Sequence, residues 1–130
     1  MFVDASALVA ILLSEPDSQR FSRAMEGAER LFTSPIAVFE IVAAVMRERA
    51  LSRRDAQRAV ERVLRIADVE VISIDGEIGG LALEAFERYG KGRGHRAQLN
   101  MGDCFSYACA KSLAVPLLYK GNDFAVTDLA

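Results

Sequence analysis

The sequence has few of the residues from which disulfides and cysteine metal sites are built. Its 130 residues contain two cysteines and a single histidine. Cys104 and Cys109 lie in one predicted helix, where their spacing separates them by roughly 140° around the axis. They can neither pair with each other nor share a metal ion. We interpret both as small core residues of a protein in a reducing compartment.

The chain also lacks a hydrophobic run long enough to cross a membrane. Its longest apolar stretch, Ala5–Leu13, is interrupted by Ser6 and is too short to span a bilayer. No basic segment followed by an apolar core and a cleavage site precedes this stretch. We therefore expect a cytoplasmic protein.

No charge of one sign dominates the sequence. The formal net charge of −2 gives no global field that would attract a nucleic acid. Local basic segments remain, namely the five arginines within Arg47–Arg58 and the glycine-rich loop Lys91–Arg96. The loop is either a solvated connector or a guide for a phosphate backbone. We interpret its histidine, His95, as a solvated loop residue rather than a catalyst.

What the sequence does contain is typical of one folded domain. Hydrophobic residues make up 52% and charged residues 26%, which describes a compact protein and not a disordered one. There is no repeat, low-complexity tract or linker. We predict a single domain over residues 1–130.

Short apolar strands alternate with helices along the chain, with pairs of helices between some of them. The predicted strands are Phe2–Val3, residues 30–34, Val69–Asp75 and residues 115–119. The predicted helices are Ala7–Leu13 capped by Ser6, one within residues 14–29 with Pro16 in its first turn, and residues 35–50, 52–67, 76–90 and 100–114, with caps at Ser34, Ser52 and Asn100. This order predicts the α/β class, with a parallel sheet covered by helices on both faces.

Four of the 18 acidic residues have no simple place on a polar helix face. Asp4 directly follows the first strand, Glu40 lies in the most apolar helix, Asp103 is in a first helical turn, and Asp123 follows the last strand. Each has a structural alternative: a helix cap, a side chain that reaches water past alanines, a partner of the helix dipole, and a turn residue.

Taken together, the four acids suggest a metal site. Asp4 and Asp123 follow parallel strands, so they lie at the same edge of the sheet, where α/β proteins bind ligands. Glu40 and Asp103 lie near the starts of helices that begin close to that edge. Four converging carboxylates repel one another unless a cation neutralises them, and Mg²⁺ or Mn²⁺ prefers oxygen ligands. Such an ion can polarise a phosphodiester and activate water.

Four segments of the chain resemble the PIN-domain ribonucleases, and most closely the VapC toxins of bacterial VapBC toxin–antitoxin pairs. The segments are MFVDASALVAIL, SPIAVFEIVAAV, YGKGRGHRAQLNMGDCFSYACAK and PLLYKGNDFAVTDL. The combination of LNMGDCFSYACAK with LLYKGNDF is the specific part. The resemblance implies a PIN-like three-layer fold, in which helices flank a central parallel sheet of four to five strands.

The resemblance also implies an activity, a site and partners. It implies an endoribonuclease toxin that uses Mg²⁺ or Mn²⁺ to cut single-stranded or structured RNA. It further implies a homodimer and a small cognate VapB-like antitoxin whose tail covers the acidic pocket. Asp4, Glu40 and Asp103 match the family's catalytic and metal-binding acids directly. Asp123 matches the fourth, although many relatives carry a polar residue at the position of Gly121, and Asn122 is an alternative.

Four other functions are weighed against the residues, and the first two lack an acidic residue that they require. A phosphoacceptor domain would need an acidic pair near the first strand and a lysine after the last; only Asp4 is present, but Lys120 fits the lysine. A haloacid-type phosphatase would need a second aspartate at Ser6. A non-catalytic binding domain and a DNA nuclease remain as further alternatives, because metal chemistry does not distinguish the sugars.

Overall fold

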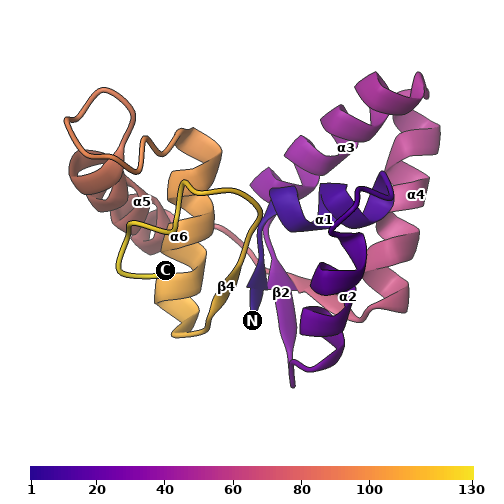
Figure 1. Cartoon of the computed structure of the whole chain (residues 1–130), viewed down its shortest axis with the longest axis horizontal. Coiled ribbons are helices and arrows are strands. Elements are labelled where there is room, and N and C mark those ends of the chain that lie inside the picture. Colours follow the sequence, from indigo (N-terminus) through magenta and orange to yellow (C-terminus); the bar gives the residue numbers. More distant parts are fainter.

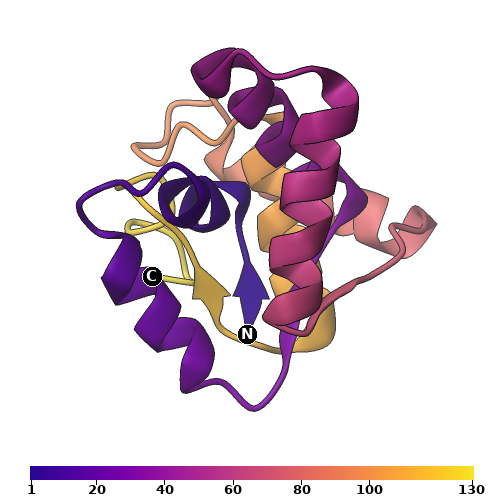
Figure 2. The same cartoon turned by 90° about the vertical axis from the view of Figure 1, so that its right-hand side faces the viewer.

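The sheet is built from four short strands that all run parallel. They are β1 (Phe2–Val3), β2 (Leu31–Thr33), β3 (Val69–Val71) and β4 (Leu117–Leu118). Their order across the sheet is β3-β2-β1-β4, so the first strand is paired with the last. Figure 2 shows β1 and β4 side by side and pointing the same way. The segments that follow β1 and β4 therefore begin next to each other.

Six helices connect and cover these strands in the computed structural model, which describes residues 1–130. They are α1 (Ala5–Leu12), α2 (Ser18–Glu26), α3 (Pro35–Arg49), α4 (Arg53–Ile66), α5 (Gly76–Tyr89) and α6 (Met101–Leu113). Several begin at a polar cap, as the sequence predicts. Ser34 accepts a hydrogen bond from Ala37 N, and Ser52 accepts one from Asp55 N.

The helices form one layer on each side of the sheet (Figure 1). α5 and α6 cover one face, and α1 to α4 cover the other. Side chains that alternate along a strand enter opposite cores: Phe2 packs in the core beneath α5 and α6, and Val3 in the core beneath α1 to α4. The predicted α/β class, with helices on both faces of a parallel sheet, is confirmed.

Some predicted boundaries are wrong, and local hydrogen bonding explains why. α1 begins at Ala5 with Asp4 as its cap, whereas we predicted a cap at Ser6. Pro16 precedes α2, whose cap position is Asp17, and is not in its first turn. The third strand stops at Val71 and does not extend to residue 75, because β2 ends at Thr33; Ile72 N still donates to Thr33 O at 2.9 Å, but β2 has no further residues to pair with the chain beyond it.

Two further findings concern the cysteines and the length of the apolar segments. Cys104 and Cys109 are both free and buried, as expected for core residues. None of the helices combines the length and the apolar composition that a transmembrane span requires.

Candidate active site

Asp4 lies at the junction of β1 and α1, with only 5% of its surface exposed. Its backbone is extended, and its Oδ2 atom accepts hydrogen bonds from the Ser6 backbone N–H at 3.0 Å and from the Ser6 hydroxyl at 2.6 Å. Asp4 therefore does cap α1, as the structural alternative for it predicts. Both bonds engage one oxygen, which leaves Oδ1 without a protein donor.

Asp103 occupies the first turn of α6 and is fixed by a reciprocal capping box. Its Oδ2 atom accepts from Asn100 N at 3.0 Å, and Asn100 Oδ1 accepts from Asp103 N at 2.9 Å. As with Asp4, one carboxylate oxygen is committed to the helix end. The capping box thereby holds the carboxylate at the carboxyl edge of the sheet.

Glu40 comes from the second turn of α3 and lies against the start of α6, since α3 and α6 contact each other. A Cβ atom placed on Gly102 would lie 2.7 Å from the carboxylate carbon of Glu40. The absence of a side chain at Gly102 is therefore what lets this carboxylate approach α6 next to Asp103. Glu40 is half-buried and does not extend freely into water past its alanine neighbours.

Asp123 lies in the loop after β4 and is exposed, as is its neighbour Asn122. Gly121, with φ +96°, makes the left-handed turn that starts this loop. The pairing of β4 with β1 brings the loop to the edge of the sheet that holds Asp4.

Repulsion between these carboxylates shows that they are close together. Burial, reinforced by the charges of Asp4 and Asp103, raises the pKa of Glu40 to about 7. Burial also raises the pKa of Asp103 to about 6; the Asn100 hydrogen bond opposes this increase, while the charges of Asp4 and Asp123 add to it. Glu40 and Asp103 are thus each affected by Asp4, Glu40 also by Asp103, and Asp103 also by Asp123, which places the four acids that the sequence singled out at the same edge.

The four carboxylates suit a hard cation that keeps part of its water shell better than one that takes all of its ligands from the protein. No three His, Cys, Asp or Glu side chains of the chain are gathered closely enough to ligate one ion together. Mg²⁺, however, usually keeps several waters and takes only one or two carboxylates from the protein. Two half-buried acids with raised pKa values beside a third buried one are electrostatically suited to such an ion.

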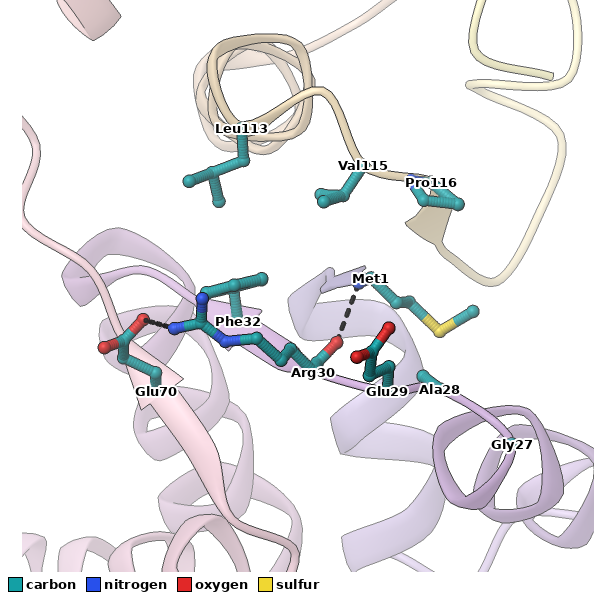
Figure 3. A pocket seen from close by; sticks show the side chains of 10 residues that line it. All are labelled: Met1, Gly27, Ala28, Glu29, Arg30, Phe32, Glu70, Leu113, Val115 and Pro116. Carbon is teal, nitrogen blue, oxygen red and sulfur yellow. Dashed lines mark hydrogen bonds and ion pairs between the residues drawn. The ribbon is translucent and has the colours of Figure 1, made fainter.

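The acidic edge is distinct from a hollow at the opposite end of the strands. Figure 3 shows this hollow, which has a volume of about 660 Å³ and lies among residues that mostly precede strands. Inside it the amino terminus donates to Arg30 O at 2.8 Å, and the Arg30 side chain pairs with Glu70 at 3.4 Å. These polar groups are thus partnered with each other, and none of the four acids contributes to the hollow.

The basic loop between α5 and α6 presents three exposed cations, Lys91, Arg93 and Arg96. The ion pairs of the chain all lie elsewhere. His95 is turned inward: its Nδ1 atom accepts from Ala97 N at 3.0 Å, and its ring packs edge-on against Tyr89. This placement agrees with a loop residue and gives no support to a catalytic histidine.

Lys120 does not take the position that a phosphoacceptor domain requires. Its ammonium group pairs with Glu15 at 2.9 Å and Asp17 at 3.2 Å. It is held by the connection between α1 and α2, so the geometry gives no support to the phosphoacceptor alternative.

Sequence reasoning missed Gly102. The available signal was a glycine directly before Asp103 in the first turn of a helix, where glycine lowers helix propensity and has to be explained by something else. The explanation is the close approach of Glu40.

Comparison with known proteins identifies the family. The PIN domain model matches residues 1–129. A VapC ribonuclease of Rhizobium meliloti (strain 1021) is 40% identical, with 98% of each chain covered. A ribonuclease VapC of Mycolicibacterium smegmatis is 42% identical over the whole of this chain and 98% of its own length. This chain is a VapC protein of the PIN domain family.

Solved structures confirm the PIN fold of this VapC protein. The toxin VapC20 of Mycobacterium tuberculosis, described as cleaving the sarcin-ricin loop, superimposes with a TM-score of 0.78 over 99% of this chain and 95% of its own, at 17% identity. A toxin–antitoxin complex from Klebsiella pneumoniae gives a TM-score of 0.69 over 98% of this chain and 92% of its own, also at 17% identity. The predicted PIN-like three-layer architecture is confirmed, with four strands in the sheet.

Proposed function

We propose that this protein is a metal-dependent endoribonuclease toxin whose active site consists of Asp4, Glu40, Asp103 and Asp123. The observation that carries the proposal is the gathering of these acids at one edge of a PIN fold, where burial, together with the charges of Asp4 and Asp103, raises the pKa of Glu40 to about 7. Relatives with about 40% identity over the full chain are named ribonucleases. A protein with this activity would act on RNA in the cytoplasm.

We assign each of the four acids a role in the reaction from its burial and its hydrogen bonds. Asp4 and Asp103 would hold Mg²⁺ or Mn²⁺, since a cap bond fixes each carboxylate. When bound, the ion supplies positive charge at the phosphate and lowers the pKa of the attacking water. Glu40, with a pKa near neutrality, is suited to accept a proton from that water. Exposed Asp123 would orient water or a second ion from the open side.

We propose that a small cognate antitoxin neutralises the enzyme. A named toxin–antitoxin complex shares this fold, and a crevice of several carboxylates would attract a basic segment of a partner. Covering this crevice would block both metal and RNA. The test is co-purification with the product of the adjacent reading frame, followed by loss of cleavage when that product is added.

We also propose a homodimer. Exposed apolar side chains lie on α5 and α6, where Leu83 (71% exposed) and Met101 (68%) line one hollow, and on α3, where Phe39 is 74% exposed. Apolar residues gathered on one region of a surface are typical of protein interfaces. Sedimentation of the wild type against a Phe39→Ser and Leu83→Ser double variant tests this, with the variant expected as a monomer.

A cleavage assay tests the activity. The wild type is incubated with single-stranded RNA, structured RNA and single-stranded DNA, each with Mn²⁺, with Mg²⁺ or with EDTA. Asp103→Asn and Glu40→Gln are prepared in the same way, and Glu84→Gln, exposed on α5, serves as the matched control. Cleavage of RNA by the wild type and by Glu84→Gln alone supports the proposal.

Three outcomes contradict the proposal. Cleavage by all the variants would indicate a contaminating nuclease. Cleavage of DNA in preference to RNA would support the DNA nuclease alternative. No cleavage and no Mn²⁺ binding by the wild type would favour the non-catalytic binding domain.

A further inference from the structure

Lys120 joins two segments that are far apart in the sequence and close to the acidic site. It lies two residues beyond the end of β4, in the loop that leads to Asp123. Its ammonium group pairs with Glu15 at 2.9 Å and with Asp17 at 3.2 Å, in the connection between α1 and α2. These contacts fix the start of the Asp123 loop against the segment that follows α1.

The backbone of the same residue reaches Asp4 through Ser6. Lys120 N–H donates to Ser6 Oγ at 2.9 Å, and Ser6 Oγ–H donates to Asp4 Oδ2 at 2.6 Å. A hydroxyl has one proton to give. Because the Ser6 hydroxyl accepts from Lys120, its single proton is directed at the carboxylate of Asp4, which accepts only.

The chain of bonds determines which oxygen of Asp4 faces outward. Oδ2 receives both the Ser6 hydroxyl and the Ser6 backbone N–H. Oδ1 has no protein donor, yet no fully buried polar side-chain atom of the chain lacks a partner. Oδ1 must therefore be accessible from the crevice, and it is the oxygen presented to a cation.

We propose that Lys120 is a positioning residue for Asp4, acting through the Ser6 hydroxyl while Glu15 and Asp17 hold its own side chain. The proposal rests on the proposed metal-dependent function. Ion pairs on a protein surface contribute little to stability, and groups that orient metal-binding carboxylates typically tune metal affinity. Loss of the Lys120 ion pairs should therefore affect the site more than the fold.

Lys111 provides a matched control for this role. Its side chain is exposed to the same extent as that of Lys120, 37%, and it also makes an ion pair, with Asp128 at 2.6 Å. That pair ties the C-terminal segment to α6 and involves none of the four acids. Removing either side chain breaks a similar surface ion pair, but only Lys120 is connected to Asp4 by hydrogen bonds, through Ser6.

The experiment compares Lys120→Met, Lys120→Arg and Lys111→Met. Mn²⁺ affinity is measured by calorimetry on the full-length protein, and kcat and KM are measured on single-stranded RNA. Lys120→Met should weaken Mn²⁺ binding and lower kcat by about 10-fold to 100-fold, with KM little changed. Lys120→Arg should recover most of both, since a guanidinium can bridge the two carboxylates. Lys111→Met should match the wild type in both.

A double variant, Glu15→Gln with Asp17→Asn, removes the ion pairs and leaves Lys120 in place, in case Lys120→Met does not fold. It should show the same loss of Mn²⁺ affinity. If either variant binds Mn²⁺ and turns over as Lys111→Met does, the positioning role is wrong while the nuclease proposal stands. If the wild type neither binds Mn²⁺ nor cuts RNA, the proposed function itself fails.

Discussion

The carboxylate of Glu40 on α3 rests against the backbone of Gly102 on α6, where even a methyl group would collide with it. Gly102→Ala should therefore displace the carboxylate. A misplacement of about 1 Å in an active site costs on the order of 100-fold in rate, so we expect RNA cleavage to slow by a factor of that size.

Gly80→Ala is the control for that substitution. Gly80 lies within α5 and has open space around its Cα. Alanine there should raise the free energy of unfolding by about 1 kcal/mol through helix propensity and leave cleavage unchanged. Equal cleavage by the two variants would mean that Glu40 does not depend on the space at Gly102.

Asparagine and alanine at position 4 should separate the two roles of Asp4. Both Asp4→Asn and Asp4→Ala should abolish cleavage and the stabilisation of the protein by Mn²⁺. Asparagine can still cap α1, whereas alanine loses the bonds from Ser6 and should cost about 1 kcal/mol of unfolding free energy. Urea unfolding of metal-free protein measures the difference. If Mn²⁺ still stabilises Asp4→Asn, Asp4 is not a ligand of the metal ion.

The metal-free protein should become less stable as the pH rises from about 4 through the raised pKa values of Asp103 and Glu40, about 6 and about 7. These carboxyls have higher pKa values folded than unfolded, so their contribution to stability is present at low pH and is lost as they ionise. Melting temperatures across this range should decline in the wild type and decline less in Glu40→Gln. Parallel curves for the two proteins would contradict the burial and repulsion assigned to Glu40.

Cleavage should have the opposite pH dependence. Metal and proton compete for the same carboxylates, and a base must be ionised to accept a proton. The pKa of Glu40 is about 7 without metal, and the charge of a bound Mn²⁺ lowers it. The rate with Mn²⁺ should therefore rise with pH and level off at or below about pH 7, once Glu40 is ionised. A rate that does not change from acidic to neutral pH would exclude Glu40 from the proton transfer.

The exposed cations Arg93 and Arg96 should contribute to RNA binding by pairing with phosphates. In a cleavage-inactive Asp103→Asn background, Arg93→Ala with Arg96→Ala should weaken binding mainly at low salt. On single-stranded RNA, the slope of log K against log salt should fall by about 0.7 for each phosphate that the protein no longer neutralises. Arg23→Ala, exposed on α2, is the control. A slope equal to that of the control would make the loop a simple connector.

The placement of the acids was predictable because it follows from chain topology. Parallel strands end at one edge of a sheet, so Asp4 and Asp123 could be assigned to that edge from the strand order alone. The cap at Asn100 was equally readable from local pattern, whereas the apolar composition of α3 did not reveal its exposed face, on which Phe39 is 74% exposed. The residues named in this way are the ones whose raised pKa values, or whose effects on a neighbour's pKa, mark the candidate site.

What local pattern could not provide was the packing of distant segments against each other. The approach of Glu40 to Gly102 depends on how α3 packs on α6, and the pairing of Lys120 depends on the fold of the α1–α2 connection. The sequence also presented helix capping and metal binding as alternatives for Asp4 and Asp103. The geometry permits both at once, because a carboxylate has two oxygens and each cap engages only one.

The pairing of the first strand with the last has a consequence during synthesis. A growing chain that is still being made on the ribosome carries Asp4 and Glu40, while Asp103 and Asp123 are yet to be translated. β1 has no neighbour on one side until β4 is made, so the two halves of the acidic edge meet only when nearly the whole chain has emerged. Products of translation that stop before β4 would lack Asp123 and the strand that completes the edge, so we expect them to be inactive, and the host would be exposed to the nuclease only after β4 and the loop that follows it have been made.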